Sequence, residues 1–370
     1  MKTCVRPEGL CPGDKVAVVS LSKGILGEES CRHDLHLGSM RLNELGLVPE
    51  FMPNSLQGVD FLAEHPEARA ADLKRAFQDD SIRGIFCAIG GDDTYRTVPY
   101  CMGDPGFVHL VQEHPKIFSG FSDTTVNHLM FYQLGLSTFY GPSFINDLAE
   151  LGTEMLPYTM NAMGRYLAGF PNRPITSSPV WYEERTDFSE AQMGVSRADH
   201  PETHGYEVLQ GEGTFSGILL GGCTETIYDL LTGAVHPEAK TVNETYHLFP
   251  EGEEWDGKIC FLETSEEKPS PELLAKELSA IREKGVFDHA AGLIIGKPQD
   301  EVHYEAYKEV YQQAAGGKIP ILYNVNFGHA YPRTVLAIGQ EAVVDLEKRE
   351  IRYPQPVVTG PEDAQTGGKE

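Results

Sequence analysis

The stretch Lys116-Ile-Phe-Ser-Gly-Phe-Ser-Asp-Thr124 joins a short apolar run to the start of a helical pattern. Residues 116–121 are predicted to form a buried strand, and apolar residues then recur at helical spacing until Gly135. A strand that leads directly into a helix is typical of α/β proteins with parallel sheets. We therefore expect Ser122 to lie where a strand ends and a helix begins.

The same alternation continues on both sides of this stretch. Before it, we expect strands at 15–20, 47–51 and 84–89 and helices at 29–45 and 67–77. The second block is predicted to contain strands at 213–219, 258–262, 292–295 and 320–323, short strands near Val335 and Val343, and helices at 224–231, 271–284 and 304–313. This rhythm predicts an α/β fold with a parallel sheet and helices on both of its faces.

The length of 370 residues exceeds the usual span of one hydrophobic core and favours two domains. Between the two alternating blocks the pattern weakens, and Pro, Glu and Ser become frequent. We expect an N-terminal domain at 1–165 that carries Ser122, a connecting excursion or lid at 166–212, a C-terminal domain at 213–353 and a flexible tail at 354–370.

Composition excludes several classes of partner. A formal charge of -25 repels phosphate backbones and anionic lipid, so we expect neither a nucleic acid nor a membrane as partner. Seven cysteines without C-x-x-C spacing fit neither a disulfide framework nor a zinc site and indicate a reducing compartment. The first twenty residues contain no signal-peptide-like apolar region, and we expect a cytoplasmic protein.

Ser122 lies in Gly120-Phe-Ser-Asp-Thr124, which resembles a nucleophile elbow except that Thr124 replaces the second Gly of G-x-S-x-G. A serine there stands beside the backbone N–H groups that open a helix. The alternative is that Ser122 or Asp123 only caps the helix.

A second Gly-rich turn, Gly90-Gly91-Asp92-Asp93, follows the strand at 84–89 at the same sheet edge, and its backbone offers a second oxyanion donor. A turn that needs Gly only for its conformation is the alternative there.

A serine nucleophile needs a base, and histidine has the appropriate pKa. Among thirteen histidines we favour His329, which follows a predicted strand and is adjacent to a Gly, whereas His128 is expected to be an ordinary surface or interface residue. The imidazole needs an acceptor that fixes its tautomer. Glu263 ends the apolar strand at 258–262 and is the candidate, with a solvated loop acid as the alternative.

Several short motifs resemble the serine LD-carboxypeptidase family, which includes murein tetrapeptide carboxypeptidases and microcin C self-immunity peptidases. In order along the chain, they are Gly13-Asp-Lys-Val-Ala-Val-Val-Ser20, Gly90-Gly91 with Arg96, Gly120-Phe-Ser-Asp123, Gly221-Gly222, Phe261-Leu-Glu-Thr264 and Gly328-His329 before Pro332. The resemblance implies a Rossmann-like N-terminal domain with a parallel sheet, a smaller β-rich α/β C-terminal domain, an active site between them and a homodimer.

The resemblance also implies a triad of nucleophile Ser122, orienter Glu263 and general base His329. It implies oxyanion donors at the backbone N–H groups of Gly91 and Asp123, and no cofactor.

Two departures from the family pattern bear on the substrate. Cys223 stands where many relatives have Asn, and Glu267 stands where microcin immunity peptidases have Lys, so both positions leave specificity open. Trp181 in the excursion is a candidate substrate-binding residue that stacks on an adenine or covers a peptide, with a packing anchor as the alternative.

The predicted function is that of a serine carboxypeptidase or amidase that cuts an amide bond in a small peptide or aminoacyl-nucleotide substrate. The bond is either the LD bond before the terminal D-alanine of a murein tetrapeptide, cut during peptidoglycan recycling, or the amide of a microcin-like toxin. A non-catalytic sugar- or nucleotide-binding α/β protein is the alternative. Metal-assisted hydrolysis is disfavoured because no H-E-x-x-H or comparable pair occurs, and no metal is expected.

Overall fold

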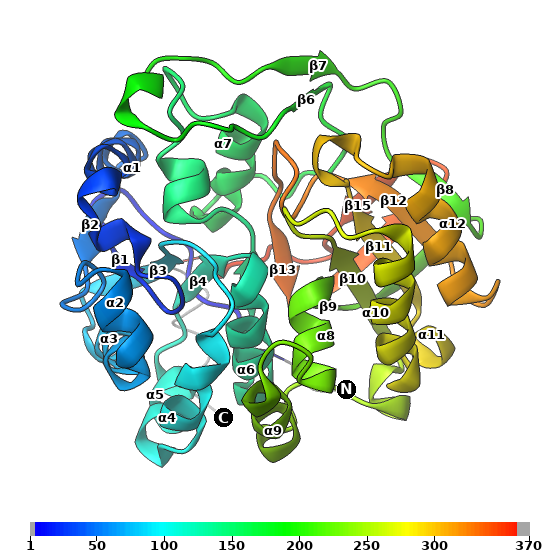
Figure 1. The fold of residues 1–370 in the computed structure, drawn as a ribbon, viewed down its shortest axis with the longest axis horizontal. Coiled ribbons are helices and arrows are strands. Elements are labelled where there is room, and N and C mark those ends of the chain that lie inside the picture. Colours follow the sequence, from blue (N-terminus) through cyan, green and yellow to red (C-terminus); the bar gives the residue numbers. More distant parts are fainter. Residues whose placement is uncertain (1–3, 361–370) are drawn as a thin grey trace.

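The computed structural model describes residues 4–360 and contains two large β-sheets, one in each half of the view in Figure 1. The first sheet has six strands in the order β13-β5-β4-β3-β1-β2. These strands are β1 (Lys15–Val19), β2 (Val48–Phe51), β3 (Ile82–Cys87), β4 (Ile117–Gly120), β5 (Thr138–Tyr140) and β13 (Leu336–Ile338). All neighbouring pairs are parallel except β13 with β5. The predicted parallel sheet is confirmed.

The second sheet has seven strands in the order β15-β14-β9-β10-β11-β12-β8. They are β8 (Glu207–Gln210), β9 (Thr214–Cys223), β10 (Lys258–Glu263), β11 (Gly292–Gly296), β12 (Ile321–Val325), β14 (Glu341–Asp345) and β15 (Glu350–Arg352). The central strands β9 to β12 are parallel, and antiparallel strands flank them at both edges. This mixed, β-rich sheet confirms the predicted fold class for the second block.

The α-helices lie along the two sheets and between them (Figure 1). They are α1 (Arg32–Glu44), α2 (Val59–Glu64), α3 (Pro66–Gln78), α4 (Val98–Met102), α5 (Pro105–Glu113), α6 (Thr125–Leu134), α7 (Pro157–Met163), α8 (Thr224–Thr232), α9 (Pro237–Tyr246), α10 (Pro271–Glu283), α11 (Val286–His289) and α12 (Tyr304–Ala315). Local signals fix several ends: Ser270 caps α10 by accepting the Leu273 N–H, and α6 stops at Gly135 with a φ of 85°.

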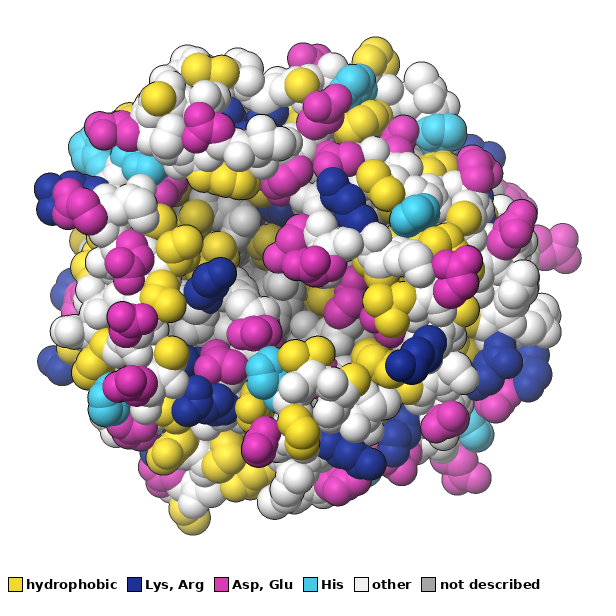
Figure 2. Space-filling model, in the orientation of Figure 1, with side chains coloured by type: hydrophobic (Ala, Val, Ile, Leu, Met, Phe, Trp, Pro, Cys, Tyr) yellow, Lys and Arg dark blue, Asp and Glu magenta, His cyan; other side chains and the backbone are white. Residues whose placement is uncertain are grey.

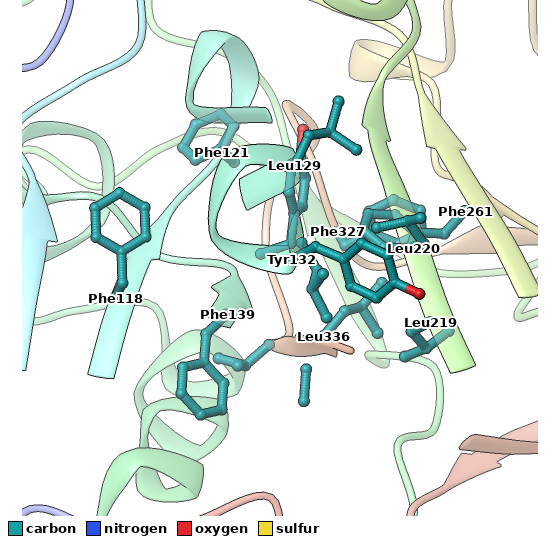
Figure 3. Packing of buried hydrophobic residues seen from close by; sticks show 14 of the residues in the cluster. Phe118, Phe121, Leu129, Tyr132, Phe139, Leu219, Leu220, Phe261, Phe327 and Leu336 are labelled. Carbon is teal, nitrogen blue, oxygen red and sulfur yellow. The ribbon is translucent and has the colours of Figure 1, made fainter. Parts of the chain in front are cut away.

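The two sheets share one hydrophobic core. Phe118, Phe139 and Leu129 of the first half pack in the same cluster as Leu219 and Phe261 of the second (Figure 3). Strand β13 connects them further, because it lies late in the chain but pairs with β5 of the first sheet. The loop between β12 and β13, which contains His329, is thereby held next to the strands that carry Ser122.

Residues 166–212 do not form a simple linker. They contribute β8 to the second sheet and a small hairpin of β6 (Val180–Tyr182) and β7 (Asp199–Pro201). In Figure 1 the hairpin segment crosses the top of the molecule from the α1 side to the β8 side. Hydrogen bonds from Arg185 and Arg197 to Glu150, which is 3% exposed, hold this segment against the first half of the molecule. Among the described residues, no helix is both long enough and apolar enough to cross a bilayer.

Candidate active site

A cavity of about 890 Å³ lies where loops of both sheets meet. Figure 2 shows the corresponding hollow near the centre of this face, with acidic side chains at its rim. Its lining comes mainly from residues 22–24, 89–95, 121–126, 223–239 and 265–267, which follow strands of the two sheets. Ligands of open α/β sheets bind at such carboxyl ends of strands.

Ser122 projects into this cavity from the turn between β4 and α6. Its φ of 64° lies in the left-handed region, which is uncommon for a residue with a side chain. Such backbone strain is found where the surrounding structure holds a residue for function. The Ser122 side chain forms no capping bond to the following helix, and its Oγ lies 3.1 Å from Nε2 of His329. The helix-cap alternative therefore does not describe Ser122.

His329 lies between Ser122 and Glu263. Its Nδ1 donates a 2.8 Å hydrogen bond to Oε2 of Glu263, and its backbone N–H donates to the same oxygen at 3.1 Å. Glu263 ends β10 and is only 1% exposed, so it is not a solvated loop acid. A Cβ at Gly328 would lie 2.4 Å from the Glu263 carboxyl group, and only glycine allows this approach.

Tyr140 links the turn that carries Ser122 to the Glu263 carboxylate. Its hydroxyl donates to Oε1 of Glu263 at 2.6 Å and accepts the backbone N–H of Ser122 at 3.1 Å. Burial and the neighbouring Glu263 charge raise the pKa of Tyr140 well above its ordinary value, so the phenol keeps its proton. Both oxygens of Glu263 are thus engaged, and the carboxylate has a fixed orientation.

Two backbone N–H groups without an acceptor in the described part of the chain belong to residues that line the cavity. Those of Gly91 and Asp123 have no protein acceptor among residues 4–360, and both residues line the cavity. The Asp123 carboxylate accepts hydrogen bonds from Ser22 Oγ at 2.6 Å and from the Thr94 N–H at 2.9 Å. These bonds join the turn that carries Ser122 to the loop at Ser22 and to the residue that follows Asp93. Gly91 has a φ of 153°, and a Cβ there would lie 2.2 Å from Ser22 Oγ.

A second carboxylate contacts the imidazole. Oε2 of Glu266 lies 2.9 Å from Nε2 of His329, on the atom that also faces Ser122. Burial lowers the pKa of His329, but the charges of Glu263 and Glu266 and their hydrogen bonds outweigh it and raise the pKa to about 10. The hydrogen bond with His329 in turn lowers the pKa of Glu266 to about 2. This arrangement favours the imidazolium form of His329.

Arg333 holds the loop that carries His329. Its guanidinium is 1% exposed, donates to the His329 carbonyl at 2.9 Å and to the Gly328 carbonyl, and pairs with Asp147 at 2.8 Å. It also lies 4.3 Å from the centre of the Phe121 ring. The loop is therefore fixed from the side of the first sheet.

Cys223 ends β9 and lines the cavity, with its thiol donating to Glu225 at 3.3 Å. The Cys223 Sγ atom, a carboxylate oxygen of Glu263 and a ring nitrogen of His329 lie within 4.8 Å of one another. Cysteine, glutamate and histidine are residue types that can bind a metal. However, burial raises the pKa of the Cys223 thiol well above its ordinary value, and a protonated thiol is a poor ligand. We place Cys223 in the cavity wall; the predicted absence of a metal stays a prediction.

Trp181 lies on β6 and is not among the residues that line the cavity. It stacks on His200 with ring centres 4.3 Å apart, and the Lys297 ammonium lies 5.2 Å from its ring. The aromatic residue of this segment that does line the cavity is Phe188, whose side chain is 52% exposed. A substrate role for Trp181 stays a prediction, and Phe188 is a candidate that the sequence analysis missed.

Sequence reasoning also missed Tyr140, Glu266 and Arg333. Tyr140 ends a strand at the same sheet edge as Ser122, and this position was a usable signal. Nothing in the sequence distinguished Glu266 from the neighbouring Glu267, because only the loop conformation turns one of them toward His329. The expectation for His128 was wrong: it is fully buried, and its ring nitrogens bond Thr138 and the Gly120 carbonyl, because the tightly packed α6 covers β4 and β5.

The structure therefore brings together Ser122, His329 and Glu263, with Gly91 and Asp123 in the lining of the same cavity. A hydroxyl, an imidazole and a carboxylate in this order form the arrangement of hydrolases with a serine nucleophile. The chain belongs to the LD-carboxypeptidase family: the model of the family's N-terminal domain matches residues 16–141, and that of its C-terminal domain matches residues 216–344.

Individual relatives agree with this membership. A probable murein peptide carboxypeptidase of Bacillus subtilis (strain 168) is 25% identical over 353 residues, which cover 93% of this chain and 92% of that protein. An MccF-like protein from Streptococcus pneumoniae, solved in complex with AMP, is 45% identical with a TM-score of 0.89, covering 92% of this chain and 98% of that one. The chain is accordingly a peptidase.

A more distant solved structure shares the fold. The microcin C7 self immunity protein MccF, solved in complex with aspartyl sulfamoyl adenosine, is 21% identical with a TM-score of 0.78. The match covers 96% of this chain and all of that one (100%).

Proposed function

We propose that this peptidase hydrolyses an amide bond in a small substrate through an acyl-enzyme, with Ser122 as nucleophile, His329 as general base and Glu263 as orienter. The observation that carries the proposal is the line of contacts from Ser122 Oγ through both His329 nitrogens to Glu263, at 3.1 and 2.8 Å. These distances match those of a nucleophile and base in hydrogen-bond reach.

In the first step, Ser122 Oγ attacks the carbonyl carbon while its proton passes to Nε2 of a neutral His329. The carbonyl oxygen becomes an oxyanion that accepts the free N–H groups of Gly91 and Asp123. The C–N bond then breaks as His329 returns the proton to the leaving nitrogen. A water molecule, activated by the same imidazole, hydrolyses the ester and restores the Ser122 hydroxyl.

For the substrate, we favour an aminoacyl group joined through an amide-type bond to a nucleotide-like moiety. The MccF-like protein solved with AMP is 45% identical to this chain, and the 890 Å³ cavity has room for such a molecule. Phe188 offers an exposed ring at the cavity for a base to stack on. The second candidate is a murein peptide, supported by the family description and by the Bacillus subtilis relative.

Three further expectations belong to this proposal. A cytoplasmic location is supported by the cysteine usage, and the homodimer by the resemblance alone. The domain division at 166–212 agrees with two separate family-domain matches, although β13 lies in the first sheet.

The experiment compares wild type and Ser122→Ala on aspartyl or glutamyl sulfamoyl adenosine and on murein tetrapeptide, with products identified by mass spectrometry. We expect wild type to release the amino acid from the first substrate, and the variant to bind it without turnover. Release of D-alanine from the tetrapeptide alone would select the second candidate. Unchanged binding without any hydrolysis by wild type would favour the non-catalytic alternative.

A further inference from the structure

Glu266 occupies a position that opposes the proposed chemistry. General base catalysis needs a lone pair on Nε2 of His329, whereas a carboxylate 2.9 Å from this nitrogen favours a proton on it. Among the described residues, His329 is the ion-pair partner of Glu266, whose side chain lines the cavity and is 60% exposed. The carboxylate is therefore held by one contact and is free to turn away.

The other groups around the imidazole do not compete with this contact. Glu263 at the end of β10 holds Nδ1, Cys223 at the end of β9 points to Glu225, and Arg333 bonds the His329 carbonyl rather than its ring. The Phe121 ring packs edge-on against the imidazole. Lys23, also in the cavity lining, is the other cation that acts on Glu266. Release of Glu266 alone therefore changes the charge on the Nε2 side.

A cation brought by the substrate would release Glu266 from His329. The carbonyl carbon attacked by Ser122 must sit next to Oγ, and the α-nitrogen of the same residue is two bonds from that carbon. Glu266 lies on the same Nε2 atom that faces Oγ, so this nitrogen falls within reach of its carboxylate. A free α-ammonium is cationic, whereas an α-nitrogen in a peptide bond is neutral and offers no ion pair.

We propose that Glu266 is a specificity-determining residue that binds the free α-ammonium of the acyl residue, and that its transfer from His329 to the substrate frees the base. The inference rests on the proposed function and deepens it. It assigns the preferred substrate class as a single aminoacyl group with an unblocked amine. Peptides whose scissile carbonyl belongs to an internal residue leave Glu266 on His329 and react slowly.

The first test measures the ion pair without any substrate. The pKa of His329 is followed by NMR of the imidazole in wild type, Glu266→Gln and the charge-matched control Glu283→Gln, whose residue is exposed on α10 outside the cavity lining. We expect Glu266→Gln to lower the pKa of His329 by at least one unit and the control to leave it unchanged. Equal values in all three proteins would overturn the inference.

The second test uses glutamyl sulfamoyl adenosine and its N-acetyl derivative. Wild type should prefer the free amine at least tenfold in kcat/KM, and Glu266→Gln should lose most of this preference, because any effect on the base alone is common to both substrates. With the free amine, the acid limb of wild-type kcat should lie at lower pH than that of kcat/KM, because the bound substrate holds Glu266.

Two results separate failure of this inference from failure of the proposed function. If wild type hydrolyses both compounds equally well, or if Glu266→Gln keeps the full preference, Glu266 does not recognise the amine. The proposed hydrolase activity is not contradicted by either result. If wild type hydrolyses neither compound, the inference fails, and the proposed function fails with it only if the murein tetrapeptide is also left intact.

Discussion

The Tyr140 hydroxyl donates a 2.6 Å hydrogen bond to Oε1 of Glu263 inside the core. The Tyr140 hydroxyl oxygen accepts the Ser122 N–H, so one phenol holds both the turn that carries Ser122 and the Glu263 carboxylate. In Tyr140→Phe both groups lose a partner in a buried site. We expect a loss of about 1–3 kcal/mol in the free energy of unfolding and a fall in kcat of about tenfold. Denaturant unfolding and steady-state kinetics measure the two effects.

Tyr166→Phe is the matched control. Tyr166 is equally buried and its hydroxyl bonds Ser119 at 2.7 Å, away from the three site residues. The control should lose stability and keep kcat. If both variants lose kcat equally, the special role of Tyr140 is refuted.

The strained backbone at Ser122 leads to a stability prediction. A φ of 64° disfavours alanine as much as serine, whereas glycine adopts it freely. Ser122→Ala and Ser122→Gly should both abolish turnover, and the glycine variant should be more stable than the alanine variant by up to about 1 kcal/mol. Thermal unfolding of the two inactive proteins provides the comparison. A less stable glycine variant would mean that the turn is not strained.

Gly91→Ala should reduce kcat by about 10²–10³-fold, which is the usual effect of losing one oxyanion donor. The added Cβ would lie 2.2 Å from Ser22 Oγ, so the turn must move and its N–H must leave the cavity. Gly13→Ala separates strain from displacement, since Gly13 also has positive φ (93°) but open space around it. The Gly13→Ala control should lose stability and keep its kcat. A normal kcat for Gly91→Ala would show that the Gly91 N–H is not an oxyanion donor.

Stability below pH 6.5 should depend on His128. Burial lowers the pKa of His128 to about 4, against an ordinary value of 6.5, so the folded protein keeps this ring neutral. The unfolded chain binds the proton first, and stability is complete above pH 6.5 and declines as the pH falls toward 4. His128→Gln, which retains a donor for the Gly120 carbonyl, should flatten this decline. Unfolding curves across pH 4–7 test it, and an identical slope in both proteins would contradict the assignment.

Phe188 should distinguish the two substrate candidates. Its ring is 52% exposed at the cavity, and stacking of a base on an aromatic ring contributes about 1–3 kcal/mol. Phe188→Ala should raise KM for an aminoacyl sulfamoyl adenosine about tenfold and leave a tetrapeptide unaffected. Met193→Ala changes an exposed apolar residue of the same segment outside the cavity lining and serves as control. Equal effects on both substrates would rule out base stacking.

The sequence by itself determined the order of the elements. The strands at 15–20, 84–89 and 258–262 and the helix at 271–284 agree with β1, β3, β10 and α10 to within a few residues. This succeeds because the period of apolar residues and the Gly and Pro signals are local properties of the chain. The same signals placed Ser122 and Glu263 at strand ends, where parallel sheets present their functional residues.

Only the tertiary structure decided which side chains meet. It brought His329, the histidine that the sequence analysis favoured, to Ser122, turned Glu266 but not Glu267 onto the imidazole, and left Trp181 outside the lining of the cavity that Phe188 lines. In the folded chain β13 pairs with β5 of the first sheet. This pairing brings the loop that carries His329 to Ser122, although the two residues are 207 positions apart in the sequence. Such contacts depend on how separate elements pack, and no local pattern of residues encodes them.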